Sequence, residues 1–224
     1  MRLMRVVHFA FSSKQGNAAE TDGKGGTMAE VKIGSLKRTE INKAAALASK
    51  AFIETPLCKA ALGGTSPKHL KRLQMGLKKQ IGLKVGELLA AREIEELVGV
   101  LRMVTSPDCQ KKALPTFAVP FAFLSIGTAA LLLYEWRKVW GKHDPGQPHF
   151  HIDPLAVMPD KQGRGIGSAL LTHFCEQVDT CEMHAYLETD QQRNVRLYER
   201  FGFEVQDTDM VLGVKNWFMW RKAR

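Results

Sequence analysis

Cysteine is scarce in the 224-residue chain, and no cysteine belongs to a C-x-x-C pair or is followed by histidines at ligand spacing. Zinc modules and redox-active dithiols depend on such pairs, so the pattern predicts free thiols in a reducing, cytoplasmic setting and no bound metal. The sequence also lacks a G-x-x-x-x-G-K-S/T motif, in which a lysine reaches the outer phosphates of a nucleotide. Transfer of a γ-phosphate is therefore not indicated.

The composition is that of an ordinary soluble globular domain. Hydrophobic residues make up 45% of the chain and charged residues 25%, and the length is ample for one core. We expect a single domain over residues 28–224. Residues 1–27 are basic, contain serine and fit no packed element. They predict an extension before the domain, either disordered or an organelle-targeting segment.

Positive charge is concentrated in one stretch of the chain. The formal net charge is +9, and residues 67–84 carry several lysines and arginines but no acid. A basic face can attract nucleic acid, anionic lipid or an acidic ligand, and it can also be a solvated helix face. Because no aromatic residue is interleaved with these charges, we expect a solvated face and no nucleic-acid partner.

Residues 113–134 form an uncharged apolar run that is long enough to cross a membrane. Two prolines, Pro115 and Pro120, interrupt this run, and the segments on either side of it both have strand patterns. A single membrane crossing would separate those strands, which we assign to one sheet. We therefore expect no membrane span, and instead a helical insertion over residues 113–142, packed on the domain.

Periodicity along the rest of the chain alternates between strand and helix patterns. A short turn at residues 93–95 joins two strand patterns into a hairpin, and the chain closes with a second hairpin. The order predicts a mixed α/β fold with one β-α-β crossover. The expected strands are 29–37, 86–93, 96–105, 149–157, 184–190, 203–211 and 216–222, and the expected helices begin at residues 39, 67, 166 and 193.

The stretch "VMPDKQGRGIGSALL", residues 157–171, opens a helix with glycines at alternate positions, as phosphate-binding turns do. One interpretation is the dinucleotide motif G-x-G-x-x-G, nearly matched by Gly163, Gly165 and Ser168, with Glu188 at a suitable distance. The context disfavours it, because residues 158–162 separate the preceding strand from the glycines. The flanking hairpins also do not suit a doubly wound parallel sheet.

The second interpretation is a pyrophosphate cradle of the form Q-x-x-G-x-G, supplied by Gln162, Gly165 and Gly167. Glycines allow the backbone to approach the ligand, and successive amides at the positive end of the helix point at phosphate oxygens. Arg164 can add a direct charge. The residues expected to hold the phosphates are Gln162, Gly163, Arg164, Gly165, Ile166, Gly167 and Ser168.

Together, "LAVMPDKQGRGIGSALL" and the later "LETD" and "RNVRLYERFGF" resemble the GNAT superfamily of acyl-CoA-dependent N-acetyltransferases. The resemblance implies a central mixed, splayed β-sheet flanked by helices, with acetyl-CoA as cosubstrate and its pyrophosphate on the Q-x-x-G-x-G turn. It also implies that the backbone amides of Leu155 and Val157 pair with the pantetheine arm, and that Asn194 bonds the same arm. Pro154, which has no amide, fits an irregularity in that strand.

Tyr198 matches the family tyrosine that protonates the departing thiolate, although an aromatic on that helix face can equally be a core residue. His151 lies where family members with a side-chain base place a glutamate, so we expect His151 to be the base. His149, Asp153 and Glu188 remain alternatives, and each can equally be a structural polar residue.

The resemblance implies an N-acetyltransferase in which a primary amine attacks acetyl-CoA directly in a ternary complex. A catalytically weak acyl-CoA-binding or sensor domain is the alternative, and the presence of Tyr198 argues against it. We expect a small amine-containing acceptor, because the apolar insertion suggests a covered pocket. A protein acceptor and a homodimer both stay open.

Overall fold

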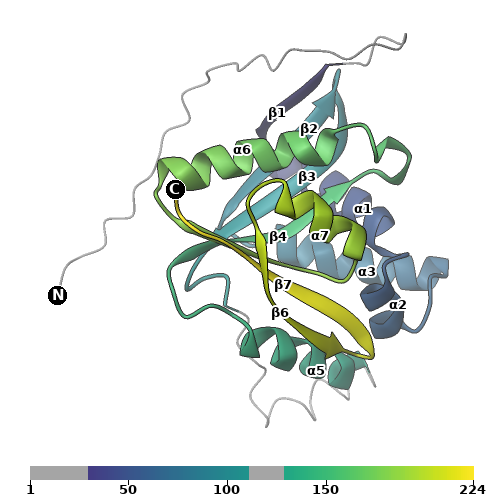
Figure 1. Cartoon of the computed structure of the whole chain (residues 1–224). Helices are drawn as coiled ribbons and strands as arrows, with labels where there is room; N and C mark the ends of the chain where they lie inside the picture. Colours follow the sequence, from purple (N-terminus) through teal and green to yellow (C-terminus); the bar gives the residue numbers. More distant parts are fainter. Residues whose placement is uncertain (1–29, 111–128) are drawn as a thin grey trace.

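A seven-stranded sheet forms the centre of the computed structural model, which describes residues 30–110 and 129–224. The strands follow the spatial order β1-β2-β3-β4-β5-β7-β6 (Figure 1). Their bounds are β1 Val31–Ser35, β2 Glu87–Glu93, β3 Glu96–Thr105, β4 His149–Val157, β5 His184–Thr189, β6 Glu204–Val211 and β7 Val214–Arg221.

Strands β4 and β5 form the parallel pair of this sheet, and the other neighbours run antiparallel. The parallel pairing is short and extends from His149, opposite His184, to His151, opposite Tyr186. Beyond His151, β4 stays paired with β3, and within the described ranges it has no further pairing with β5. The mixed, splayed sheet predicted from the sequence is confirmed.

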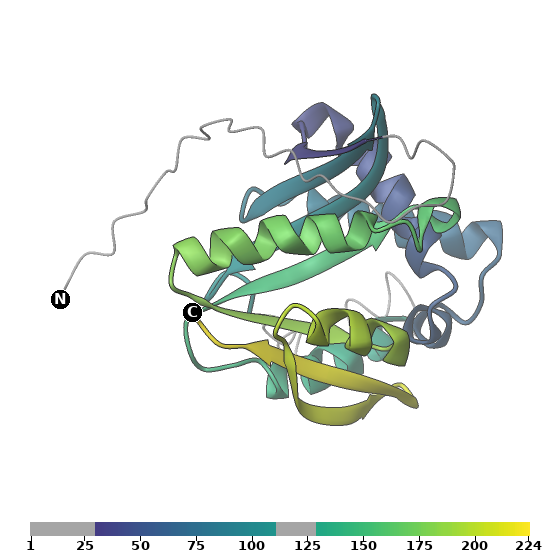
Figure 2. The same ribbon diagram turned by 45° about the horizontal axis from the view of Figure 1, so that its top comes forward.

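Helices cover both faces of the sheet (Figures 1 and 2). Helices α6 (Ile166–Thr180) and α7 (Gln192–Glu199) lie over one face and supply apolar side chains to the larger core. Helices α1 (Ile41–Phe52) and α3 (Pro67–Ile81) pack on the opposite face, over small residues of β2, β3 and β4. α5 (Ala129–Lys142) lies beside β6.

Gly99 in β3 sets how closely α6 lies on the sheet. A Cβ atom at this position would lie 3.0 Å from Ile166 Cγ2 and 3.1 Å from Leu170 Cδ1, closer than packed carbon atoms normally approach. Both contacts belong to the first turns of α6, the part of the helix that follows the glycine turn. The absence of a side chain at residue 99 thus allows the start of α6 to pack directly on β3.

Strand β4 is irregular at Asp153 and Pro154. In the pairing with β3, Leu155 lies opposite Leu101 and Ile152 opposite Met103, so two β4 residues face the single residue Arg102. The irregularity expected from Pro154 is confirmed. Because of it, Ile152 and Leu155 pack in the same core although they lie three positions apart, an offset that in a regular strand places side chains on opposite faces.

The strands and helices expected from periodicity are present, and the structure adds a short helix, α2 (Pro56–Leu62), that the periodicity does not predict. α2 begins after Thr55, whose hydroxyl accepts a hydrogen bond from the amide of Cys58, and ends at Gly63 in the left-handed conformation with φ +76°. The signals were present as a cap, a proline and a glycine, but the helix is too short for periodicity to show.

Two predictions fall partly or wholly on residues outside the described ranges. The extension over residues 1–27 lies entirely outside them, and so do residues 113–128 of the predicted helical insertion. The remainder of the insertion forms α5. Among the described residues, no helix combines the length and apolar character that a membrane crossing requires. The basic run is largely exposed on α3, as expected of a solvated face.

Candidate functional site

The glycine turn before α6 depends on backbone conformations that favour glycine. Gly163 has φ +77° and Gly165 has φ +81°, both in the left-handed region, and Gly165 is the N-cap of α6. α6 begins at Ile166, and the first amides of a helix have no partner within it. The turn therefore presents backbone N–H groups at the positive end of a helix, which is the chemistry that binds phosphate.

The edge of β4 that faces away from β3 leads into this turn. The amide of Met158 donates to the carbonyl of Val98 in β3, and backbone groups of successive strand residues point alternately to the two edges. Leu155 and Val157 therefore point their amides toward the opening between β4 and β5. In agreement, the carbonyl of Val157 accepts a hydrogen bond of 3.1 Å from Gln162 Nε2 rather than from β3.

Arg164 forms an ion pair with an acid that the sequence analysis did not select. Its guanidinium lies 3.0 Å from a carboxylate oxygen of Glu93, at the end of β2, and Lys161 Nζ lies 2.8 Å from the other oxygen. Glu93 is buried, and nothing in its local sequence distinguishes it from the adjacent glutamates of the turn. The arrangement holds the glycine turn against the β2–β3 hairpin.

Asn194 and Tyr198 lie on α7, beside the end of β5. Asn194 Nδ2 donates to the hydroxyl of Thr189 at 3.4 Å. Tyr198 is 7% exposed and packs in the larger core. Its pKa is raised, first by burial and second by the negative charge of Asp190, so the phenol stays protonated at neutral pH.

Asp190 is a further, partly buried acid that the sequence analysis did not select. Its carboxylate accepts a 2.8 Å hydrogen bond from the amide of Leu57 in the first turn of α2. Burial raises the pKa of this carboxyl, and the hydrogen bond from Leu57 acts in the opposite direction. Asp190 therefore joins α2 to the end of β5, next to the helix that carries Tyr198.

His151 and Glu188 are in direct contact across the two parallel strands. His151 Nε2 lies 2.7 Å from Glu188 Oε2, and the side chains are 1% and 4% exposed, respectively. The ring of His151 also packs against Tyr186, with 5.2 Å between the ring centroids. Of the alternatives for the base, Glu188 is thus the partner of His151, while Asp153 instead lies 4.0 Å from Arg102 Nη1.

His149 belongs to a second cluster of polar side chains, with Cys109 and Asp144, beside this pair. Its Nε2 lies 3.4 Å from Cys109 Sγ and 3.8 Å from Asp144 Oδ1. Burial by itself raises the pKa of the Cys109 thiol, but hydrogen bonds with His149 and His151 outweigh it, and the pKa is lowered overall. Sequence reasoning missed Cys109 and Asp144, because their approach to His149 depends on the tertiary fold.

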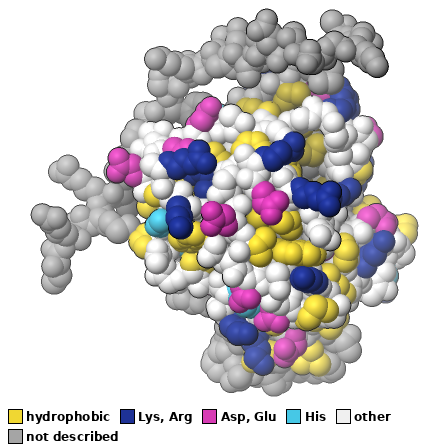
Figure 3. All heavy atoms as spheres, viewed as in Figure 1, with side chains coloured by type: hydrophobic (Ala, Val, Ile, Leu, Met, Phe, Trp, Pro, Cys, Tyr) yellow, Lys and Arg dark blue, Asp and Glu magenta, His cyan; other side chains and the backbone are white. Residues whose placement is uncertain are grey.

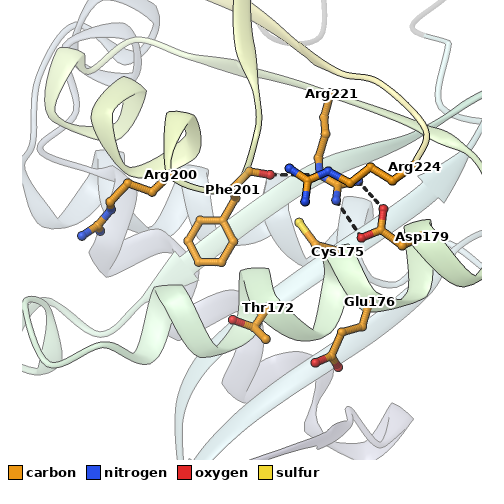
Figure 4. A pocket seen from close by; sticks show the side chains of 8 residues that line it. All are labelled: Thr172, Cys175, Glu176, Asp179, Arg200, Phe201, Arg221 and Arg224. Atoms are coloured by element: carbon orange, nitrogen blue, oxygen red, sulfur yellow. Dashed lines mark hydrogen bonds and ion pairs between the residues drawn. The ribbon is translucent and has the colours of Figure 1, made fainter.

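A hollow in the described part of the surface is distinct from the glycine turn. It has a volume of about 210 Å³ and lies over the C-terminal half of α6. Figure 4 shows Arg221 reaching Asp179 across it. The hollow is lined by Thr172, Cys175, Glu176, Asp179, Arg200, Phe201, Arg221 and Arg224.

On the face seen in Figure 3, Lys and Arg side chains are interspersed with Asp and Glu, so neither sign of charge dominates that face.

The sequence profile of the acetyltransferase (GNAT) family matches residues 74–203, which include the sheet from β2 to β5, the glycine turn and α7. The match covers more than half of the chain. The protein belongs to the GNAT acetyltransferase family.

Relatives of known name share part of the chain. The mycothiol acetyltransferase of Paenarthrobacter aurescens (strain TC1) is 29% identical over 115 residues, which are 49% of this chain and 36% of that protein. The mycothiol acetyltransferase of Streptomyces coelicolor is 30% identical over 104 residues, which are 45% of this chain and 32% of that protein. The chain thus matches about a third of the length of these relatives.

Solved structures share the fold over nearly the whole described chain. A crystal structure described as histone acetyltransferase HPA2 and related acetyltransferase, from Corynebacterium glutamicum, has a TM-score of 0.64 at 20% identity, covering 87% of this chain and 97% of its own. PaiA N-acetyltransferase from Thermoplasma acidophilum, in complex with coenzyme A, has a TM-score of 0.55 at 14% identity, covering 86% and 99%. These similarities establish the fold.

Proposed function

We propose that this protein is an N-acetyltransferase that moves an acetyl group from acetyl-CoA to a primary amine by direct attack in a ternary complex. Membership of the GNAT family supports acetyl-CoA as the donor. The observation that carries the proposal is the continuity between the free edge of β4 and the glycine turn. An extended ligand laid along Leu155 and Val157 meets the start of α6 at its other end.

The glycine turn would hold the pyrophosphate. Amides from Arg164 to Ser168 would donate to its oxygens, and the helix dipole of α6 favours the negative charge. The side chain of Arg164 is engaged with Glu93, so we assign the binding to the backbone first and to the guanidinium second. Leu155 and Val157 would pair with the pantetheine arm as an added strand does, and Asn194 would bond the same arm.

The chemistry needs a neutral amine, whereas an ordinary alkylamine with a pKa of about 10.4 is almost fully protonated at neutral pH. His151, held by Glu188, would take the proton. Because His151 is buried, a water chain rather than direct contact would deliver that proton. The Leu155 amide would stabilise charge on the acetyl oxygen, and Tyr198 would protonate the thiolate of coenzyme A as it departs.

We propose a small amine-bearing molecule as the acceptor. The named relatives are mycothiol acetyltransferases, which is consistent with that choice. In this fold the acceptor would meet α1, α2 and the segment between β3 and β4. α2 and α5 contact each other there, and α5 exposes Leu131 and Leu133, which favours an acceptor with an apolar portion.

Calorimetric titration of acetyl-CoA tests the binding site. Gly165→Glu places a carboxylate at the turn and should abolish binding, whereas Gly165→Ala keeps the neutral charge and reports the backbone strain alone. Gly76→Glu is the matched control: Gly76 lies on α3, and a Cβ atom there meets nothing within 4 Å. Equal binding by wild type and Gly165→Glu would contradict the proposed site.

A sensor domain that binds acyl-CoA without transferring it is the second candidate, favoured by the burial of His151 and Tyr198. A panel of small amines, followed by mass spectrometry, separates the two functions. An acylated amine establishes the transferase. Tight binding of acetyl-CoA with no acylated product from any amine would establish the sensor.

A further inference from the structure

Three side chains that can each ligate a metal ion, and that differ in chemical type, lie close together beside the His151–Glu188 pair. Cys109 follows the end of β3, Asp144 follows the end of α5, and His149 begins β4. One ligand atom from each, a thiol sulfur, a carboxylate oxygen and an imidazole nitrogen, lies within 4.8 Å of the other two. Cys109 and His149 are 40 residues apart in the sequence, which is why spacing motifs do not reveal the group.

Two of the distances between ligand atoms are close to those around a tetrahedral metal ion. Zinc bonds of about 2.0–2.3 Å at tetrahedral angles place pairs of ligand atoms about 3.3–3.7 Å apart. In the protein, His149 Nε2 lies 3.4 Å from Cys109 Sγ and 3.8 Å from Asp144 Oδ1. Thiolate, imidazole and carboxylate together suit Zn²⁺ better than Mg²⁺ or Ca²⁺, which prefer oxygen ligands.

The orientation of His149 provides a second, independent observation. Its Nδ1–H donates to the carbonyl of Gln147 at 2.7 Å. A backbone carbonyl accepts only, so Nδ1 carries the proton and Nε2 presents its lone pair to Cys109 and Asp144. Metal-ligating histidines are held by this type of outer hydrogen bond, which fixes both the tautomer and the ring.

The surroundings of the three ligands are largely buried and aromatic. His149 is fully buried and Cys109 is 7% exposed. Tyr186 and Trp220 stand edge-on to the His149 ring, at 5.6 and 5.7 Å between centroids. The Tyr186 hydroxyl is buried and has no hydrogen-bond partner in the described part of the chain. A water on the fourth position of a metal ion would offer one.

We propose that Cys109, Asp144 and His149 form a structural zinc site. The site would join Cys109, beyond the end of β3, to Asp144 and His149, and would thereby fix the C-terminal end of α5 near the start of β4. Binding would displace the thiol proton, so that sulfur, nitrogen and oxygen each contribute one electron pair to the ion. This role is independent of the transferase activity.

Cobalt(II) titration of the chelator-treated full-length protein tests the site, because a thiolate ligand gives cobalt a strong near-ultraviolet charge-transfer band. We expect one equivalent of Co²⁺ to produce that band, Zn²⁺ to remove it by displacement, and Zn²⁺ to raise the melting temperature. Cys175→Ala is the matched control, since Cys175 is a buried free thiol elsewhere in the fold. It should behave as wild type.

Variants of the ligands locate the ion. Cys109→Ser should lose the charge-transfer band, and Asp144→Asn should weaken Zn²⁺ binding by about 10-fold or more. A wild-type protein that binds no Zn²⁺ and gives no thiolate band would overturn the proposal. So would a band of full intensity in Cys109→Ser, because the metal would then lie elsewhere. If a variant fails to fold, the wild type and Cys175→Ala still show whether the protein binds Zn²⁺ through a thiolate other than that of Cys175.

Discussion

His151 Nε2 lies 2.7 Å from Glu188 Oε2, and this contact joins β4 to β5 at the point where the two strands part. His151 is the last residue of β4 that pairs with β5, opposite Tyr186, and Glu188 lies two residues farther along β5. The carboxylate therefore orients the imidazole at the base of the opening. Under the proposed function, this imidazole is the general base.

Replacing His151 should slow catalysis without preventing cofactor binding. His151→Gln removes the proton acceptor, and we expect kcat to fall by about 10²–10⁴-fold while the affinity for acetyl-CoA stays near that of wild type. Glu188→Gln should have a smaller effect, because it removes only the orienting charge. Steady-state kinetics and calorimetry measure both quantities.

His173→Gln serves as the control for a histidine lost elsewhere, since His173 lies on α6 away from the strand opening. It should retain wild-type kcat. An unchanged kcat in His151→Gln would remove His151 from the mechanism.

Tyr198→Phe should separate the chemical role of Tyr198 from its packing role. The ring stays in the core beside Phe203, so the melting temperature should change little, whereas loss of the phenol should lower kcat by about 10-fold or more. Because the pKa of Tyr198 is raised by burial, its ionisation should not reduce wild-type activity below about pH 10. Full kcat in the variant would leave Tyr198 a core residue only.

The ion pair between Asp179 and Arg221 should contribute to stability in a pH-dependent way. Arg221 donates two 2.7 Å hydrogen bonds to the carboxylate and is itself buried. Asp179→Asn should lower the free energy of unfolding by about 1–3 kcal/mol at neutral pH, a range that allows for the partial exposure of Asp179. Urea denaturation measures the loss.

Acid should reduce this difference between wild type and variant. Hydrogen bonding to Arg221 lowers the pKa of Asp179 in the folded protein, so the stabilisation is fully present above the unfolded value of about 3.9 and is lost as pH falls through the folded pKa. Glu54→Gln, in the exposed pair with Lys59, is the control and should cost less than about 1 kcal/mol. A pH-independent difference between wild type and Asp179→Asn would argue against the linkage.

Gly99→Ala should loosen the contact between α6 and the sheet. The added methyl would lie within 3.1 Å of Ile166 and Leu170, so the helix must shift, at a cost of about 1–3 kcal/mol. Since α6 begins at the glycine turn, we also expect weaker binding of acetyl-CoA. Gly34→Ala, where a Cβ meets nothing within 4 Å, should leave both thermal stability and calorimetric affinity unchanged.

The parts of the site that the sequence predicts are those encoded locally. The glycine turn is one such part, because Gly163 and Gly165 supply the left-handed conformations within a few residues of the helix they open. Pro154 likewise marks the irregularity in its own strand. For such features the residue type and the backbone geometry belong to the same short segment, and no tertiary information is needed.

The parts that the sequence does not predict are pairings across distant elements. Glu93 meets Lys161 and Arg164 only because the β2–β3 hairpin lies beside the glycine turn. Cys109 reaches His149 only after the intervening segment has returned to the sheet. Each of these residues is ordinary in its local context, and its chemistry arises from the neighbour that the fold supplies.

The irregularity at Asp153 and Pro154 makes the length of β4 as important as its composition. His149 and His151 precede the irregularity, and Leu155 and Val157 follow it. The irregularity shifts the alternation of side chains between the two faces by one residue, so that Ile152 and Leu155 face the same core. Deleting one residue there would rotate one half of the strand onto the wrong face. Single-residue exchanges at these positions would preserve that phase, whereas insertions and deletions would uncouple the end of the strand that carries His151 from the end that leads into the glycine turn.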